Sequence, residues 1–110
     1  MIVDNKKELV PAIIAVKVAS TARLDIEATL CKTGKIVTKA CYNGIRVEDI
    51  ISTFSGVKDI RKRIAALVEH KEIELLLLYT AREVAETERD FAAFVSDMRD
   101  LYGLKVICYK

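Results

Sequence analysis

Cationic and hydroxyl side chains gather in three short stretches of this sequence. The first contains Lys17 and Ser20 in the letters KVAS, and the second begins at Ser55 in SGVKDIRKR. The third holds Arg82 in the letters TAR. A hydroxyl becomes a useful nucleophile only with help from its surroundings, and planar guanidinium groups match the oxygen atoms of a phosphate. These residue types therefore indicate binding of a phosphate group, or chemistry on one.

Each of the three stretches follows an apolar run that has the pattern of a buried β-strand. Nearly continuous runs of apolar and β-branched residues are typical of strands covered on both faces. They predict strands over residues 12–18, 45–52, 73–79 and 104–109.

Helical patterns fill the segments between these strands. Residues 25–42 form the first, with a buried face predicted from the spacing of Ile26, Leu30, Val37 and Cys41. Gly34 inside this helix costs roughly 1 kcal/mol relative to Ala. Residues 59–70 form the second, and the third begins after Thr87, in a capping-box pattern, and ends at Gly103.

Strands that alternate with helices at this spacing predict a parallel sheet with right-handed crossovers. The fold class is therefore α/β, a flavodoxin-like three-layer sandwich. We expect a four-stranded parallel sheet in the order 2-1-3-4 with about three helices. Because the carboxyl ends of parallel strands meet at one edge of the sheet, the three stretches are expected to lie together there.

Over residues 12–109 the chain resembles the catalytic domain of the serine recombinases, the resolvase and invertase family. KVAST is similar to the Arg-Val-Ser-Thr that ends the family's first strand. NGIRVEDIISTFSGVKDIR is similar to the family's Asn-Gly, second strand and Ser-Gly with an Arg five residues on. LLLLYTAR resembles the third strand, which ends in Asp-Arg, and RDFAAFVSDMRDLYGLKVICY resembles the helix, Gly and fourth strand that follow.

The resemblance implies site-specific DNA recombination of the kind that moves mobile elements. A serine attacks a DNA phosphodiester, a 5′-phosphoseryl intermediate forms, and the strands are rejoined after subunit exchange in a tetramer. No metal, ATP or other cofactor takes part. The residues implied as catalytic are Ser20, Lys17, Arg61 and Arg82. Those implied to bind DNA phosphates are Ser55, Lys62 and Arg63.

The sequence also departs from the family pattern at several positions. When Lys17 is matched to the family's first Arg, Ala19 rather than Ser20 takes the place of the nucleophile. Ala81 stands where the family has an Asp, and Ala85 where it has a second Arg. Because the loss of one transition-state donor costs about 10²–10³ in rate, we expect weak or no activity.

Other interpretations remain open for the same residues. Ser20 could simply cap the first helix, Arg61 could lie on a solvated helix face, and Arg82 could pair with nearby carboxylates. At the level of the chain, one alternative is a non-enzymatic oligomerisation or regulatory module of a recombinase. A further alternative is a flavodoxin-like binder of a small phosphorylated ligand.

Composition also bears on the compartment, the partners and the number of domains. The 110 residues carry a net charge of +2, three cysteines and one histidine. With no ligand spacing for zinc and no disulfide framework, we expect a reducing cytoplasm, cysteines that fill the core, and no metal or membrane partner. Residues 1–110 are expected to be one domain without the family's DNA-binding region or long dimerisation helix. DNA is then a weak partner, and a homo-oligomer is a second candidate.

Overall fold

The chain builds one parallel sheet with helices on both faces. The computed structural model describes residues 9–110, so the first eight residues of the predicted domain lie outside the described residues. The strands are β1 (Val10–Lys17), β2 (Ile45–Thr53), β3 (Leu75–Leu78) and β4 (Lys105–Cys108). Their order is β2-β1-β3-β4, and all three neighbouring pairs are parallel. The predicted fold class and strand order are confirmed.

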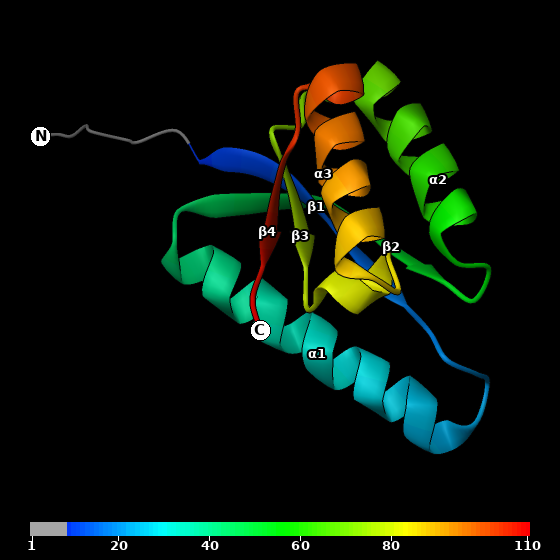
Figure 1. The fold of residues 1–110 in the computed structure, drawn as a ribbon. Coiled ribbons are helices and arrows are strands. Elements are labelled where there is room, and N and C mark those ends of the chain that lie inside the picture. Colours follow the sequence, from blue (N-terminus) through cyan, green and yellow to red (C-terminus); the bar gives the residue numbers. More distant parts are fainter. Residues whose placement is uncertain (1–8) are drawn as a thin grey trace, which may run out of the picture.

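Three α-helices and one 3₁₀ turn connect the strands. They are α1 (Arg23–Tyr42), α2 (Val57–His70), the 3₁₀ helix η1 (Ala81–Glu83) and α3 (Glu88–Tyr102). Figure 1 shows α2 and α3 together on one face of the sheet and α1 on the other. The sequence predicted the three α-helices, whereas η1 lies in what was expected to be an irregular connection.

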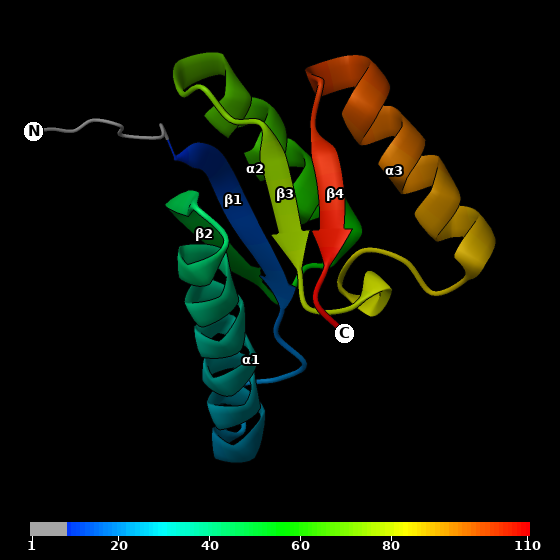
Figure 2. The same ribbon diagram turned by 90° about the vertical axis from the view of Figure 1, so that its left-hand side faces the viewer.

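β1 occupies the centre of the sheet because it is apolar along almost its whole length. Its residues 11–16 are buried, and β2 and β3 flank it. Pro11 lacks a backbone N–H, but its carbonyl still accepts a hydrogen bond from the Glu74 amide at 2.9 Å. A register shift in the β1–β2 pairing lies between Ala12 and Ile13. Figure 2 shows the strands side by side with their carboxyl ends at one edge.

A separate apolar cluster fills each side of the sheet. The larger one lies under α2 and α3 and includes Ile60, Ile64, Phe94 and Met98. The smaller one lies under α1 and includes Ile36 and Ala40. Alternate residues of β1 point into the two clusters, as a strand covered on both faces requires.

The ends of α3 follow the sequence signals closely. The Thr87 hydroxyl oxygen accepts a hydrogen bond from the Asp90 amide at 3.1 Å, which satisfies one of the free amides of the first turn. Gly103 ends the helix with a φ of 68°, a left-handed conformation that Gly adopts without steric cost. Both helix signals are confirmed.

The buried face predicted for the first helix is wrong at three of its four positions, because only Val37 packs against the apolar cluster under α1. Ile26, Leu30 and Cys41 are exposed, and the buried residues of α1 are instead Thr29, Ile36 and Ala40. The first turns of α1 extend past the edge of the sheet (Figure 1), and their apolar side chains Leu24, Ile26 and Leu30 are exposed. The cysteines also differ from expectation, because Cys31, Cys41 and Cys108 are all exposed.

No helix within residues 9–110 is both long and apolar enough to cross a membrane.

Candidate functional site

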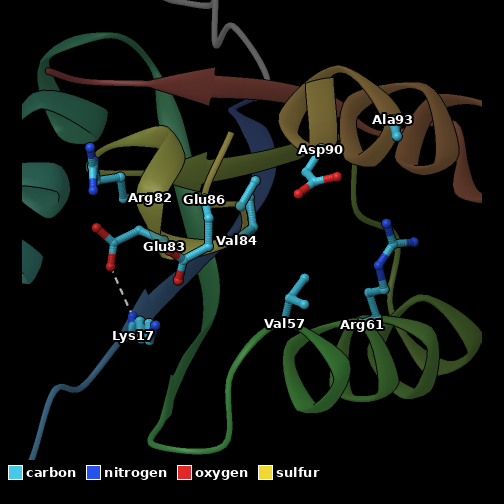
Figure 3. A pocket seen from close by; sticks show the side chains of 10 residues that line it. Lys17, Val57, Arg61, Arg82, Glu83, Val84, Glu86, Asp90 and Ala93 are labelled. Carbon is cyan, nitrogen blue, oxygen red and sulfur yellow. Dashed lines mark hydrogen bonds between the residues drawn. The ribbon is translucent and has the colours of Figure 1, made fainter. Parts of the chain in front are cut away.

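A pocket of about 340 Å³ opens at the carboxyl ends of β1 and β3. The end of β1, the start of α2, η1 and the first turns of α3 form its walls. Figure 3 shows its lining residues, which are Lys17, Val57, Arg61, Arg82, Glu83, Val84, Ala85, Glu86, Asp90 and Ala93. This is the edge of the sheet at which the sequence placed the candidate site.

Three of the predicted cations line this one pocket although they are far apart in the sequence. Lys17 comes from β1, Arg61 from α2 and Arg82 from η1. In Figure 3 Lys17 and Arg82 lie at one end of the pocket and Arg61 at the other. A second pocket of about 290 Å³ adjoins the first and shares Lys17 and Arg82 with it, but not Arg61. The cationic end of the site is therefore formed by Lys17 and Arg82.

Arg61 is held in place by contacts on α3. Its guanidinium donates to the Asp97 carboxylate at 2.9 Å, and its Cζ lies 5.0 Å from the centroid of the Phe94 ring. The Arg61 side chain is about one-third exposed. Its charge is thus partly balanced before any ligand arrives.

Carboxylates share the pocket with these cations, which the sequence analysis considered only as ion-pair partners for Arg82. Glu83, Glu86 and Asp90 line it together with Lys17, Arg61 and Arg82, so the ionised side chains are balanced in number. Three of the lining residues, Glu83, Glu86 and Asp90, come from the segment around η1 and the start of α3. An anion in this pocket would meet both attraction and repulsion.

Glu83 is the central polar group of the site. Its side chain is only 5% exposed. One carboxylate oxygen accepts from the Lys17 amide at 2.8 Å and from Lys32 Nζ at 2.6 Å, and the other accepts from the Thr80 hydroxyl at 3.1 Å. Lys32 Nζ also donates to the Lys17 carbonyl at 3.2 Å. These bonds tie α1, the end of β1 and η1 together.

Sequence reasoning considered a nearby carboxylate as an ion-pair partner for Arg82, but Glu83 pairs with Lys32 instead. One signal could have indicated this contact. Lys32 lies three residues after Thr29 and four before Ile36, hence on the face of α1 that packs against the sheet. A Lys on a packed face needs a carboxylate partner. Among the residues that the structure describes, Arg82 has no ion pair.

Ser20 lies in the turn before α1, and its hydroxyl is engaged there. Its Oγ donates to the Asp25 carboxylate and accepts from the Ala22 amide at 3.0 Å. Ala19, not Ser20, lines the second pocket beside Lys17 and Arg82. The structure therefore separates the Ser20 hydroxyl from the set of residues that line the two pockets.

The three remaining candidates lie outside both pockets. Ser55 is exposed, and its amide donates to the Thr53 hydroxyl at 3.0 Å. Lys62 is exposed on α2, and Arg63 pairs with Asp59 at 3.0 Å. Ser55, Lys62 and Arg63 therefore form no common site with Lys17 and Arg82.

Metal ligation finds no support in the arrangement of the described residues. Within residues 9–110 no group of three or more His, Cys, Asp or Glu side chains is placed to hold a metal ion. Near the site, burial raises the pKa of the Cys108 thiol, and the Glu83 carboxylate raises it further.

Comparison with known proteins places the fold in a defined class. No family model and no curated protein matches the sequence. Among solved structures, a resolvase family site-specific recombinase from Streptococcus pneumoniae superposes with a TM-score of 0.77 at 14% identity, over 91% of this chain and 72% of that one. This superposition establishes a likeness of fold.

Two further structures agree with the first. The C-terminal catalytic domain of ISC1926 TnpA, an IS607-like serine recombinase, gives a TM-score of 0.73 at 17% identity, over 92% of this chain and 70% of that one. The N-terminal catalytic domain of TP901-1 integrase gives 0.74 at 20% identity, over 90% and 77%. The chain is an α/β domain with the fold of serine recombinase catalytic domains.

Proposed function

We propose that the chain is a resolvase-like domain of a site-specific DNA recombination system that binds a DNA phosphate but cleaves DNA weakly or not at all. One observation carries the proposal. Lys17 and Arg82 line the same two pockets, while Ala19 lines the second pocket and the Ser20 hydroxyl is bound to Asp25. The cations that would hold a phosphate are present without a hydroxyl among the pocket-lining residues.

Cleavage would require more than a nearby serine. An attacking hydroxyl must approach phosphorus in line with the leaving oxygen, and fixed cationic donors must stabilise the charge that develops. Ser20 would have to break its hydrogen bonds to Asp25 and Ala22 to reach the pocket. Lys17 offers a point charge in place of the planar fork of an Arg. Both features favour binding without efficient strand transfer.

The charge balance of the site sets the expected strength of binding. Glu86 and Asp90 are exposed carboxylates on the rim, so a phosphate gains from Lys17 and Arg82 but is repelled by these groups. The net charge of +2 adds little long-range attraction to a polyanion. DNA affinity should therefore be low and should fall steeply with salt.

Comparison of two arginine variants tests the proposal. Arg82→Ala removes a pocket cation without an ion pair, and Arg99→Ala removes a cation from the last turn of α3, away from the pocket-lining residues. We expect Arg82→Ala to weaken binding to duplex DNA and to reduce the slope of log K against log salt by about 1, whereas Arg99→Ala leaves that slope unchanged.

The binding measurements on these two variants also distinguish DNA binding from binding of a small phosphorylated ligand. Equal effects of the two variants would overturn the proposed site. No binding to DNA, together with Arg82-dependent binding of a nucleoside monophosphate, would favour the small phosphorylated ligand instead. If neither ligand binds, the chain is not a phosphate-binding domain.

The non-enzymatic interaction module is supported by a different observation. Exposed apolar side chains on α3 would favour this module, but Leu101 alone is a strongly exposed large apolar side chain there. The first turns of α1 instead expose Leu24, Ile26 and Leu30. Self-association through α1 would be compatible with either function, because Lys17 and Arg82 lie in other elements.

A further inference from the structure

Among the residues that the structure describes, three lysines without an ion pair gather where α1 lies beside the carboxyl ends of β3 and β4. Lys35 Nζ lies 6.0 Å from the centroid of the Tyr79 ring, and Lys110 Nζ lies 5.7 Å from the same centroid. Lys39 Nζ lies 5.9 Å from the centroid of the Tyr109 ring. All three lysines are exposed. We call Lys35, Lys39 and Lys110 the basic patch.

The segments that form the basic patch contain no carboxylate side chain. No Asp or Glu occurs in residues 28–47, 75–82 and 104–110. Glu83, the first carboxylate after β3, is buried and already bound by Lys32. The net charge of the whole chain is only +2, so this face is positive because the acidic residues lie elsewhere. A surface of one sign with no internal counter-charge attracts a partner of the opposite sign.

The two tyrosine rings hold the ammonium groups without neutralising them. A cation over an aromatic face is attracted by the negative charge of the ring face and keeps its own charge. Tyr79 and Tyr109 are held in turn, because both pack against the apolar cluster under α1. The lysines therefore lose less side-chain freedom when an anion binds them than unsupported lysines would.

We propose that the basic patch binds the sugar-phosphate backbone of DNA beside the phosphate that the two pockets hold. The inference rests on the proposed function, since it extends the same site along α1. Lys32 lines the second pocket together with Lys17 and Arg82. Lys35 and Lys39 follow Lys32 on the same side of the helix, three and seven residues later. The patch thus continues the cationic end of the site.

The spacing of these lysines suits a row of phosphates. Lys32 and Lys39 are separated by about 10 Å along the helix axis, at about 1.5 Å per residue. Successive phosphates of one DNA strand are about 3.4 Å apart along the duplex axis, so this length corresponds to about three phosphates. A surface hollow of about 420 Å³ gives the backbone room to approach; it is lined by Cys31, Gly34, Lys35, Thr38 and Lys39.

The salt dependence of DNA binding counts the phosphate contacts and therefore tests the patch. Fluorescence anisotropy with a short labelled duplex measures binding at several salt concentrations. The patch variant is Lys35→Gln/Lys39→Gln. The control is Lys71→Gln/Lys105→Gln, which changes the net charge equally but removes exposed lysines at the end of α2 and the start of β4. Lys71 loses only an exposed pair with Asp49, which contributes little to stability.

We expect the patch variant to reduce the slope of log K against log salt by about 2, one for each lost phosphate contact. The control variant should leave the slope unchanged. Adding Arg82→Ala to the patch variant should bring the reduction to about 3, because the pockets and the patch bind one DNA molecule. Circular dichroism checks that each variant is folded.

Other outcomes distinguish the patch from the pockets. If the patch and control variants lower the slope equally, net charge alone explains the effect and the proposal fails. A slope that falls with Arg82→Ala but not with the patch variant excludes the patch and leaves the pocket function standing. A slope that falls only with the patch variant supports the patch and contradicts the pocket site.

Binding of polyglutamate measures the competing occupant, an acidic protein segment. Polyglutamate binding that depends on Lys35 and Lys39, without binding of DNA, would assign the patch to an acidic protein and overturn the proposal. Absence of DNA binding by the unaltered protein at low salt would overturn both the patch and the proposed function.

Discussion

At the scale of single residues, Glu83 determines how the site is assembled. Its buried carboxylate binds the Lys17 amide, the Lys32 ammonium and the Thr80 hydroxyl. A buried carboxylate is tolerated only when its oxygen atoms are satisfied in this way. The position of Lys17 in the pocket therefore depends on its hydrogen bond to Glu83.

Glu83→Ala should lower the free energy of unfolding by about 2–3 kcal/mol, because it leaves the Lys32 ammonium without its partner. The loss stays below that for a fully buried pair since Lys32 is 21% exposed and can turn toward water. Urea unfolding measures the effect. Glu86→Ala, an exposed carboxylate of the same pocket, is the control and should change stability by less than about 0.5 kcal/mol.

Ser20 is expected to act in structure rather than in catalysis. Ser20→Ala removes the hydrogen bonds to Asp25 and Ala22 and should cost about 1 kcal/mol of stability. It should leave DNA affinity unchanged. Trapping on supercoiled plasmid DNA should give no covalent adduct with either protein, and an adduct that Ser20→Ala abolishes would establish Ser20 as a working nucleophile.

The Cys108 thiol should react slowly for an exposed cysteine. Partial burial of the thiol and the charge of Glu83 both raise its pKa, so less of the reactive thiolate is present at a given pH. In a Cys108-only variant, iodoacetamide should modify the folded protein more slowly than the same protein in urea, with the difference shrinking as the pH rises through the folded pKa. Equal rates at every pH would contradict the raised pKa.

The residue-level site was only partly predictable from sequence. Lys17 ends one apolar strand and Arg82 follows another, so parallel-sheet geometry alone predicted that they lie at one edge. The sequence could not show that Glu83 turns inward or that Ser20 binds Asp25, because both depend on side-chain directions in irregular turns. A shift of one residue at the end of β1 decides whether Ala19 or Ser20 lines the pocket.

At the scale of elements, the existence of α1 was predicted correctly from sequence, but most of its buried face was not. Its existence and its end at Tyr42 followed from helical spacing. Its buried face did not, since the apolar side chains of Ile26 and Leu30 belong to turns that pass beyond the sheet. The helical spacing of apolar residues predicts a buried face only where the helix packs against another layer of the fold.

Gly34 within α1 and Gly103 at the C-terminal cap of α3 should respond to Ala with opposite signs. Gly34→Ala should raise the free energy of unfolding by roughly 0.5–1 kcal/mol, because Gly34 has helical neighbours and open space around it. Gly103→Ala should lower it by about 1 kcal/mol or more, since its φ of 68° strains any side chain. Thermal unfolding measures both. The same sign for both would contradict the assigned conformations.

At the scale of the whole molecule, the fold was predictable because every level of the sequence agrees. Apolar runs long enough for buried strands alternate with helical segments, and the right-handed crossover rule leaves few topologies. The charge distribution was less accessible. The sequence shows a net charge of +2, but only the folded chain brings Glu86 and Asp90 into one pocket with Lys17, Arg61 and Arg82.

The most direct measurement of the central claim is an NMR titration of the ¹⁵N-labelled protein with a short DNA duplex at low salt. Our account predicts that amide shifts concentrate at Lys17, Ala19, Arg82 and Ala85, around the shared cationic end of the two pockets, and that added salt reverses them. Shifts confined to Lys62 and Arg63 on the surface of α2, or no shifts at all, would contradict it.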